Sequence, residues 1–212
     1  MDAFERYIYL MNRDGSSPTE SSMNAGKRSI NNAFKTSPSY TLVTINGLRT
    51  DAIVTNKTNF REKSILFRPD AKVEIGSLVS YKDKTYLITE FLDRELDPKG
   101  KIELCNATVT IDFTVPGREE FIGKDVFDND VYEYVGESKL HLPAIAKTTL
   151  IDEERDRAVN LSEDRISVTI QYRDFPYDKF EVYEEIYTVK GIDRTAVIDG
   201  FGLLTILGEK EQ

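Results

Sequence analysis

Alternation of apolar and polar positions organises the chain from residue 40 onward. Within Gly76–Cys105, Val79 and Tyr81 alternate with polar residues, a short polar break follows, and Tyr86 and Ile88 resume the alternation. A period of two in β-branched and aromatic residues, interrupted by a polar turn, is the sequence signature of a β-hairpin. Another turn and another strand end the segment, which therefore predicts a three-stranded meander at the centre of a small barrel or sandwich.

The same alternation predicts strands on both sides of this meander. Asn46-Gly47, a strong signal for a two-residue hairpin turn, separates two of them. The expected strands are residues 40–45, 48–54, 63–67, 106–113, 165–172, 184–190 and 201–207. The predicted fold is therefore mainly β, built on a small SH3-like or sandwich-like β-barrel.

Two tripeptides repeat at equal offsets along the chain. Leu92-Asp93-Arg94 is followed by Gly100, and Ile192-Asp193-Arg194 is followed at the same spacing by Gly200. A strand containing tyrosine comes before each tripeptide, and an apolar strand comes after it. An internal repeat predicts two related β-units in one chain. The alternative is that two unrelated hairpins resemble each other by chance.

The first 38 residues have a different pattern. Residues 2–11 fit either one face of a helix or a buried strand, and so short a segment does not decide between them. A short helix is expected over Met23–Phe34, before Pro38 restricts the residue that precedes it. Pro116-Gly117 is the expected boundary between the two β-units. The predicted division is a partly helical arm at residues 1–38, a first β-barrel unit at 39–115 and a second β-unit at 116–212.

Charge and composition narrow the possible functions. The chain has 212 residues, with 28 Lys and Arg against 37 Asp and Glu, a net charge of −9. This balance argues against a nucleic-acid-binding protein, which needs a basic surface, but it suits a surface past which DNA slides without sticking. One Cys excludes an internal disulfide, and one His excludes multi-histidine sites. Neither a membrane-spanning run nor an export signal is expected.

No catalytic motif stands out. Cys105 lies in an apolar strand and His141 is far away in sequence, so a core cysteine and a structural histidine are favoured over a nucleophile and its base. Gly200-Phe201-Gly202 lacks the third glycine of a dinucleotide-binding motif. The charged run at residues 151–157 contains its own counter-charges, which favours a solvated surface over a metal site. We therefore expect a protein that is not an enzyme, with no catalytic, metal or cofactor-binding residues.

Several segments carry a resemblance to a known class of proteins. They are ERYIYLMNRDG (residues 5–15), SPSYTLVTINGLRTDAIV (37–54), GSLVSYKDKTYLIT (76–89), KIELCN (101–106), SEDRISVTI (162–170) and YTVKGIDRTAVIDGFGLLTI (187–206). Together they resemble minor structural proteins of tailed bacteriophages, of the head-closure or head–tail connector kind. The resemblance extends over most of the chain and is weakest over residues 115–160.

The resemblance implies a β-barrel protein that forms a homo-oligomeric ring in the neck of the virion. Such a ring lies between the portal or its adaptor and the tail, closes the DNA channel and provides the surface on which the tail docks. Its implied partners are portal or adaptor and tail proteins, and packaged DNA passes nearby without specific binding. It implies assembly in the host cytoplasm, with no membrane partner and no cofactor.

A polar loop on a small barrel can reach into a channel or a neighbouring subunit, and a flexible arm can become ordered on a partner. The candidate loop residues are Thr55, Asn56, Lys57, Asn59, Arg61, Asp93, Arg94, Asp97 and Lys99. The candidate arm contacts are Tyr7, Tyr9 and Phe34. Local packing is the alternative role for each of them.

Three other functions stay open at this stage. One is a structural protein on the tail side, such as a tail-completion or baseplate component. The second is a carbohydrate-binding β-module that presents the aromatic residues of Asp174–Tyr183. The third is an enzyme with an acidic site that has no recognisable motif. A ring visible by electron microscopy, a bound glycan or metal-dependent turnover would discriminate among these possibilities.

Overall fold

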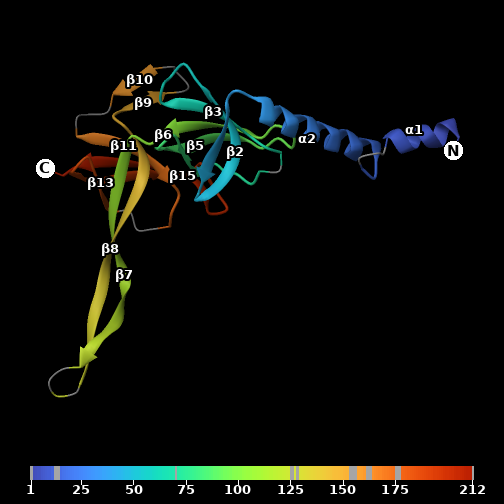
Figure 1. The fold of residues 1–212 in the computed structure, drawn as a ribbon. Helices are drawn as coiled ribbons and strands as arrows, with labels where there is room; N and C mark the ends of the chain where they lie inside the picture. Colours follow the sequence, from blue (N-terminus) through green and yellow to red (C-terminus); the bar gives the residue numbers. More distant parts are fainter. Residues whose placement is uncertain are drawn as a thin grey trace. The chain divides into compact units, whose positions relative to one another are not determined.

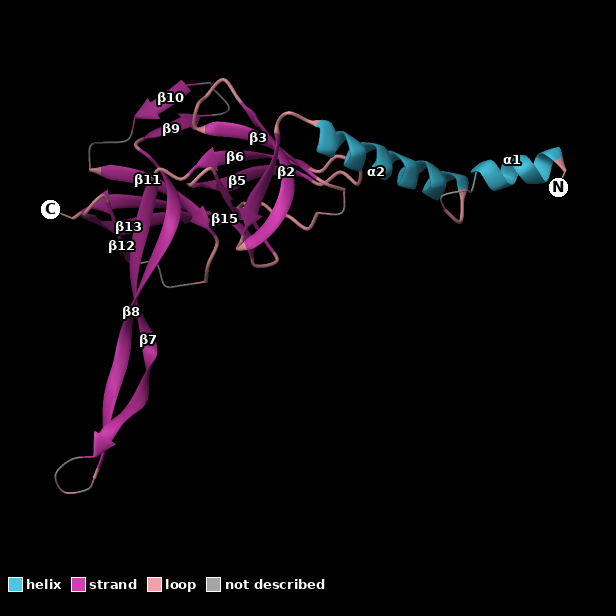
Figure 2. Ribbon diagram, viewed as in Figure 1, coloured by secondary structure: helices cyan, strands magenta, loops and turns pink. Residues whose placement is uncertain are grey.

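A computed structural model describes residues 2–11, 15–69, 71–124, 127, 129–152, 157–160, 164–174 and 178–211. The chain divides into two units, Met1–Leu104 and Cys105–Gln212, each with its own core (Figure 1). The regular elements described after residue 36 are all strands (Figure 2). The mainly β fold with two β-units that the sequence predicts is therefore confirmed.

Two helices precede the first barrel, α1 (Ala3–Met11) and α2 (Pro18–Thr36). Residues 2–11, which the sequence left open between helix and strand, contribute α1. The helix expected over Met23–Phe34 begins five residues earlier, because Ser17 caps it by accepting a hydrogen bond from the backbone N–H of Glu20 at 3.2 Å. Serine at the cap and proline in the first turn are favourable at the start of a helix.

The first barrel has six strands. They are β1 (Tyr40–Ile45), β2 (Leu48–Asn56), β3 (Glu62–Phe67), β4 (Leu78–Tyr81), β5 (Lys84–Leu92) and β6 (Lys99–Leu104). They close in the order β1-β2-β3-β6-β5-β4, and every neighbouring pair is antiparallel. The alternation read from the sequence points Val43, Ile65, Val79, Ile88 and Ile102 into the barrel core, where all are buried.

The second unit contains the remaining strands. They are β7 (Ala107–Lys124), β8 (Asp130–Lys147), β9 (Thr149–Asp152), β10 (Arg157–Asn160), β11 (Arg165–Gln171), β12 (Lys179–Val182), β13 (Glu185–Asp193), β14 (Val197–Ile198) and β15 (Phe201–Lys210). Six of them follow the order β11-β8-β7-β12-β13-β15, and pairing of β11 with β15 closes the barrel. The core contains Val109, Ile111, Val168, Ile170 and Leu204. The short strand β14 pairs with β15 outside this ring of six.

The two barrels repeat one topology. If β7, β8, β11, β12, β13 and β15 are taken as the equivalents of β1 to β6, both barrels close in the same strand order. The turn before β5 has positive φ at Lys82 and Asp83, and the turn before β13 has it at Tyr183 and Glu184. Both β5 and β13 also contain a register shift. The relation that the repeated tripeptides predict is therefore present in the topology, and those tripeptides lie at the ends of β5 and β13.

The boundary between the units differs from the predicted one. The structure divides the chain between Leu104 and Cys105, whereas the predicted boundary after residue 115 falls inside β7. Pro116-Gly117 coincides with a register irregularity between Thr114 and Arg118, not with the end of a strand. Proline cannot donate a backbone hydrogen bond, so a strand tolerates it where the ladder is irregular. A turn signal in the sequence therefore marks a break in pairing here.

Candidate interaction surfaces

The described part of the chain contains no group of three or more His, Cys, Asp or Glu side chains arranged to hold a metal ion. His141 lies on β8, with its Nδ1 atom 2.9 Å from the hydroxyl oxygen of Thr110. Cys105 is half-buried in the two-residue link between β6 and β7. Neither of the two described helices is long and apolar enough to cross a membrane.

The first candidate loop joins β2 to β3. Thr55, Asn56, Lys57, Asn59 and Arg61 are all exposed. Asn59 shapes the loop, since its Oδ1 accepts a hydrogen bond from the Arg61 N–H at 3.1 Å and its carbonyl accepts one from the Glu62 N–H at 3.0 Å. The exposed ring of Phe60, which the sequence did not single out, lies 5.5 Å from the Arg61 guanidinium carbon. The loop therefore presents an aromatic ring and a cation together.

The second candidate loop joins β5 to β6 and contains Asp93, Arg94, Asp97 and Lys99. Arg94 and Asp97 form an exposed ion pair at 3.6 Å. Between them, Leu96 lies against α2, because a Cβ atom added at Gly26 would be only 3.2 Å from Leu96 Cδ2. This loop thus contributes to holding α2 within the first unit.

The two candidate loops lie at opposite ends of the first barrel. The antiparallel register pairs Glu62 with Glu103 at one end of β3 and Leu66 with Lys99 at the other. The β2–β3 loop therefore shares its end of the barrel with the β4–β5 turn, while the β5–β6 loop shares its end with the Asn46-Gly47 turn. The structure does not bring the two sets of candidate residues together into one site.

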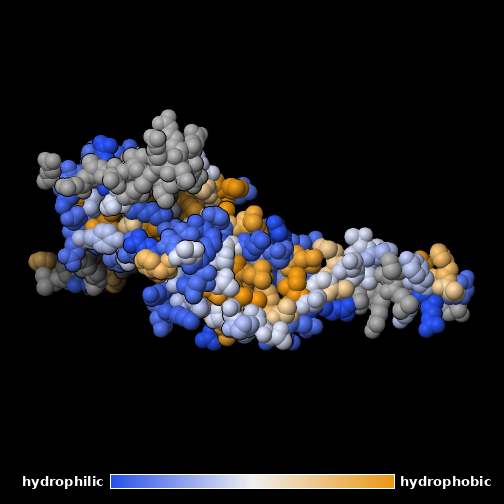
Figure 3. Space-filling view, turned by 90° about the horizontal axis from the view of Figure 1, so that it is seen from above, coloured by the Kyte–Doolittle hydropathy of each residue, from blue (hydrophilic) through white to orange (hydrophobic). Residues whose placement is uncertain are grey.

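The three predicted arm contacts separate into two groups. Tyr7 and Tyr9 on α1 are 56% and 62% exposed, so both can meet a partner. Apolar side chains of α1 appear as orange atoms at the N-terminal end of the molecule (Figure 3). Phe34 on α2 is 0% exposed, and its ring packs within the first unit. Its burial favours the local-packing alternative, and a partner contact at Phe34 stays a prediction.

A polar network surrounds the end of α2. The guanidinium carbon of Arg68 lies 5.1 Å from the centre of the Phe34 ring, and Arg68 Nη1 donates to Asn31 Oδ1 at 2.9 Å. Arg68 also pairs with Asp51, whose other carboxylate oxygen accepts a hydrogen bond from the Tyr40 hydroxyl at 2.7 Å. These hydrogen bonds, that from Tyr40 above all, lower the pKa of Asp51 and keep it charged. The network joins α2 to β1, β2 and the end of β3.

The aromatic platform considered for carbohydrate binding is reduced by burial. Phe180 is buried, and its ring stacks on Tyr187 with centroids 5.5 Å apart. Tyr183 is exposed, and its hydroxyl accepts a hydrogen bond from Asn106 Nδ2 at 3.2 Å. Residues 175–177 lie outside the described residues. Phe180 is therefore not available to stack on a sugar.

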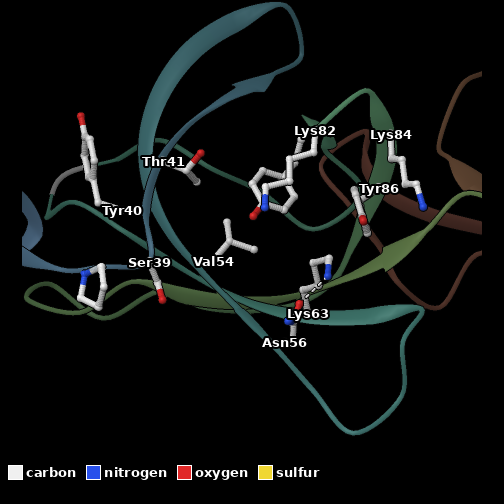
Figure 4. Close-up of a pocket in the computed structure, with 11 residues that line it drawn as sticks. Ser39, Tyr40, Thr41, Val54, Asn56, Lys63, Lys82, Lys84 and Tyr86 are labelled. Carbon is white, nitrogen blue, oxygen red and sulfur yellow. Dashed lines mark hydrogen bonds between the residues drawn. The ribbon is translucent and has the colours of Figure 1, made fainter.

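A hollow of about 450 Å³ at one end of the first barrel was not predicted from the sequence (Figure 4). Its lining comes from the ends of five strands: Pro38, Ser39, Tyr40, Thr41, Val54, Asn56, Lys63, Tyr81, Lys82, Lys84 and Tyr86. We call this hollow the basic mouth, because three lysines and no carboxylate line it. Asp83, between Lys82 and Lys84 in the turn, is not among the lining residues.

Two of the three lysines of the basic mouth contact neutral groups. Lys63 Nζ donates to Asn56 Oδ1 at 2.6 Å and lies 6.0 Å from the centre of the Tyr86 ring. Lys82 Nζ lies 5.3 Å from the Tyr81 ring. Within the described residues, none of the three ammonium groups, including that of Lys84, forms an ion pair. Their positive charge is therefore not neutralised locally.

The equivalent end of the second barrel keeps the aromatic position and changes the charge. Tyr86 and Tyr187 are both buried and both third in their strands, but Glu185 stands where β5 has Lys84. Glu185 accepts hydrogen bonds from the Tyr187 hydroxyl at 2.8 Å and Lys210 Nζ at 2.6 Å. Burial, followed by the bond to Glu185, raises the pKa of Tyr187 to about 12. At the two equivalent barrel ends, and within the residues that the structure describes, the lysines without an ion pair are therefore those of the first barrel.

The second feature that sequence reasoning missed is a long hairpin. Strands β7 and β8 pair with each other as far as Lys124 and Asp130, well beyond the barrel. The pairing of β7 with β12 is at Thr110 and Glu181. We call residues 112–139 the hairpin arm. It projects from the second barrel in Figure 1, and Phe121 and Phe127 near its end are 56% and 81% exposed. The sequence did not predict this arm, because Pro116-Gly117, which lies within β7, was expected to be the boundary between the two units.

Comparisons with known proteins agree with this division into two units. Residues 10–102 match the family model described as the YomX N-terminal domain, and residues 108–209 match that of the YomX C-terminal domain. The gap between the matches contains the structural boundary after Leu104. The first range includes α2 and the strands of the first barrel as far as Ile102, but little of α1. The second range includes the hairpin and all but the terminal residues of the second barrel's strands.

A relative that matches most of the chain comes from a prophage. The chain is 25% identical over 182 residues to the "SPbeta prophage-derived uncharacterized protein YomX" of Bacillus subtilis (strain 168), over 80% of this chain and 82% of that protein. No solved structure matches the chain. The two domain matches, in this order and over most of the chain, and the prophage relative identify the chain as a phage-derived protein with the two-domain organisation of YomX.

Proposed function

We propose that this protein is a structural component of the virion neck, forming a ring between the portal or adaptor and the tail. The observation that carries the proposal is the combination of phage origin with a hairpin arm that extends beyond its barrel. A two-stranded ribbon without other strands beside it is at most marginally stable in water. An arm of this kind gains stability when a neighbouring subunit or partner covers it.

The mainly β architecture supports an assembly role in a second way. Each small barrel places its loops at two opposite ends, so a subunit can contact one neighbour with each end. In a ring, contacts between two different surfaces repeat around the axis until the rotation closes. The exposed tyrosines of α1 add a third surface for a partner, and ordering them there has an entropy cost that the buried interface offsets.

The role is tested by removing the gene from its phage or prophage and examining the particles that form. The proposal predicts DNA-filled heads and separate tails that do not join, and complementation by the intact gene restores complete particles. Joined and infectious particles without the protein would contradict it. Full heads with malformed or shortened tails would instead favour the tail-side alternative, a tail-completion or baseplate component.

A biochemical test separates the layers of the virion. Particles are purified, dissociated into heads and tails, and analysed for this protein by mass spectrometry. Presence in multiple copies on heads agrees with the proposed neck position. Recovery with tails alone would support the tail-side role, and absence from every fraction would refute a virion role.

A further inference from the structure

The two units differ strongly in charge. Residues 1–104 contain 16 Lys and Arg against 14 Asp and Glu, whereas residues 105–212 contain 12 against 23. The net charges at neutral pH are therefore +2 and −11, which add up to the −9 of the chain. Acidity belongs to the second unit alone. An uneven distribution of this kind lets one unit attract the other in a different copy.

Within the second unit, the hairpin arm is an acidic segment. Its sequence, residues 112–139, contains eight Asp and Glu and three Lys and Arg, a net charge of −5. From Asp112 to Lys124 the strand is long enough to reach about 40 Å at roughly 3.3 Å per residue. Aromatic residues are interspersed among these charges, Phe121 and Phe127 among them. The arm therefore combines negative charge, reach and apolar side chains.

Within the first unit, the basic mouth is the complementary surface. It is concave, holds Lys63, Lys82 and Lys84 without a carboxylate in its lining, and is walled by tyrosine rings (Figure 4). Tyr86 is buried and Tyr81 is half-buried, whereas Tyr40, whose hydroxyl donates to Asp51, is exposed. Binding of single-stranded nucleic acid uses several exposed aromatic faces for successive bases, and among these three rings only that of Tyr40 is exposed. Acidic side chains of a protein segment suit the hollow better than a nucleic acid does.

We infer that the basic mouth of one copy of this chain binds the acidic hairpin arm of a second copy. The inference rests on the proposed ring and names the contact that builds it. The two surfaces are different, so the contact is heterologous, and repetition closes into a ring when the rotation allows. Electrostatic complementarity between them sets which surfaces meet and accelerates the encounter.

The test uses charge reversal in the full-length chain, followed by mass photometry and analytical ultracentrifugation. A mouth variant carries Lys82→Glu and Lys84→Glu, both exposed positions. An arm variant carries Glu119→Lys, Glu120→Lys and Asp130→Lys, which changes the arm charge from −5 to +1. A control variant, Arg49→Glu with Lys72→Glu, has the same net charge as the mouth variant but is altered at exposed positions at the opposite end of the barrel.

The expected result is specific. The wild type associates in about 0.1 M salt and dissociates in about 1 M salt, where the Debye length falls from about 10 Å to about 3 Å. Each of the mouth and arm variants loses at least tenfold in association constant, and the control variant retains it. Mixing the mouth variant with the arm variant restores association, because acidic mouths then meet basic arms.

Several results would overturn the inference. They are a wild type that stays monomeric, a control variant as weak as the mouth variant, and a mixture that fails to reassociate although both variants keep native circular dichroism. Mouth-to-arm crosslinks that form within single chains, independent of concentration, would also overturn it. So would a short single-stranded oligonucleotide that binds wild type but not the mouth variant, while self-association of that variant is unchanged.

Failure here and failure of the neck role are distinguishable. If the protein is found on phage heads but the charge-reversal variants assemble normally, only this contact is wrong. If the variants behave as expected but the protein is absent from virions, the contact stands and the neck role falls.

Discussion

Replacement of Phe34 by alanine tests whether α2 is part of the first unit. The Phe34 side chain is 0% exposed and lies beneath the Arg68 guanidinium, with 5.1 Å between the guanidinium carbon and the ring centre. Truncation of a fully buried phenylalanine to alanine costs about 3–5 kcal/mol, since apolar burial is lost and a cavity remains. Of that cost, about 0.5–1 kcal/mol comes from the lost cation–π contact with Arg68.

The assay is urea unfolding of the full chain followed by circular dichroism, together with limited proteolysis across residues 18–36. We expect Phe34→Ala to lower the free energy of unfolding of the first unit by about 3–5 kcal/mol and to expose α2 to cleavage. Phe34→Leu, which retains most of the volume, costs less than about 1.5 kcal/mol. Phe4→Ala on exposed α1 is the control and changes stability by less than about 0.5 kcal/mol.

One outcome would contradict the packing of α2 on the first barrel. If Phe34→Ala and Phe4→Ala have the same small effect, and cleavage of α2 is unchanged, the ring of Phe34 does not hold the helix on the barrel. The helix would then be a free arm, and the predicted partner contact at Phe34 would be favoured.

Three further predictions concern the second barrel. Burial raises the pKa of Tyr187 to about 12, against about 10 in the unfolded chain. The resulting stability is complete below pH 10 and is lost as pH rises toward 12, by about 3 kcal/mol in total. Urea titrations of wild type and Tyr187→Phe at alkaline pH measure this loss, and an equal fall in stability with pH for the two proteins would contradict it. Gly202 has φ +138°, and a Cβ atom there would lie 2.0 Å from the Ala196 carbonyl oxygen. Gly202→Ala should therefore destabilise the second unit by more than about 2 kcal/mol, whereas the control Gly191→Ala, where a Cβ atom enters open space, should not. Similar melting temperatures for the two variants would contradict the described turn. The side-chain amide of Asn106 accepts a hydrogen bond from the Ala146 N–H at 2.8 Å and donates one to the Ala146 carbonyl at 3.0 Å. Asn106→Ala should therefore lower the free energy of unfolding by about 1–3 kcal/mol and speed hydrogen exchange at the Ala146 amide. Unchanged exchange would exclude this role.

Most of the barrel architecture could be predicted from local patterns. Alternation around Val79 and Ile88 identified strands, and Asn46-Gly47 has the positive φ at both residues that a tight hairpin turn requires. The repeated tripeptides indicated two related units, because equivalent strand ends retained similar residues. These features are local in sequence, so a single chain suffices to find them.

The features that could not be predicted depend on contacts between distant residues. Burial of Phe34 follows from its packing near Arg68, 34 residues later, which no helical period reveals. The basic mouth collects Lys63, Lys82 and Lys84 from separate strand ends, and each alone looks like an ordinary surface lysine. The hairpin arm was divided at Pro116-Gly117, because proline and glycine mark turns more often than irregular pairing inside a long strand. A signal was available in the charge difference between the two halves.

We propose that this protein assembles into a ring that docks on the portal side of the phage neck. The most direct measurement is the mass and shape of the purified chain, alone and mixed with portal rings of its own phage, by light scattering and electron microscopy. The account predicts recruitment as a closed ring onto the portal complex. A strict monomer that ignores portal and adaptor, and binds tail tube or glycan instead, would contradict it.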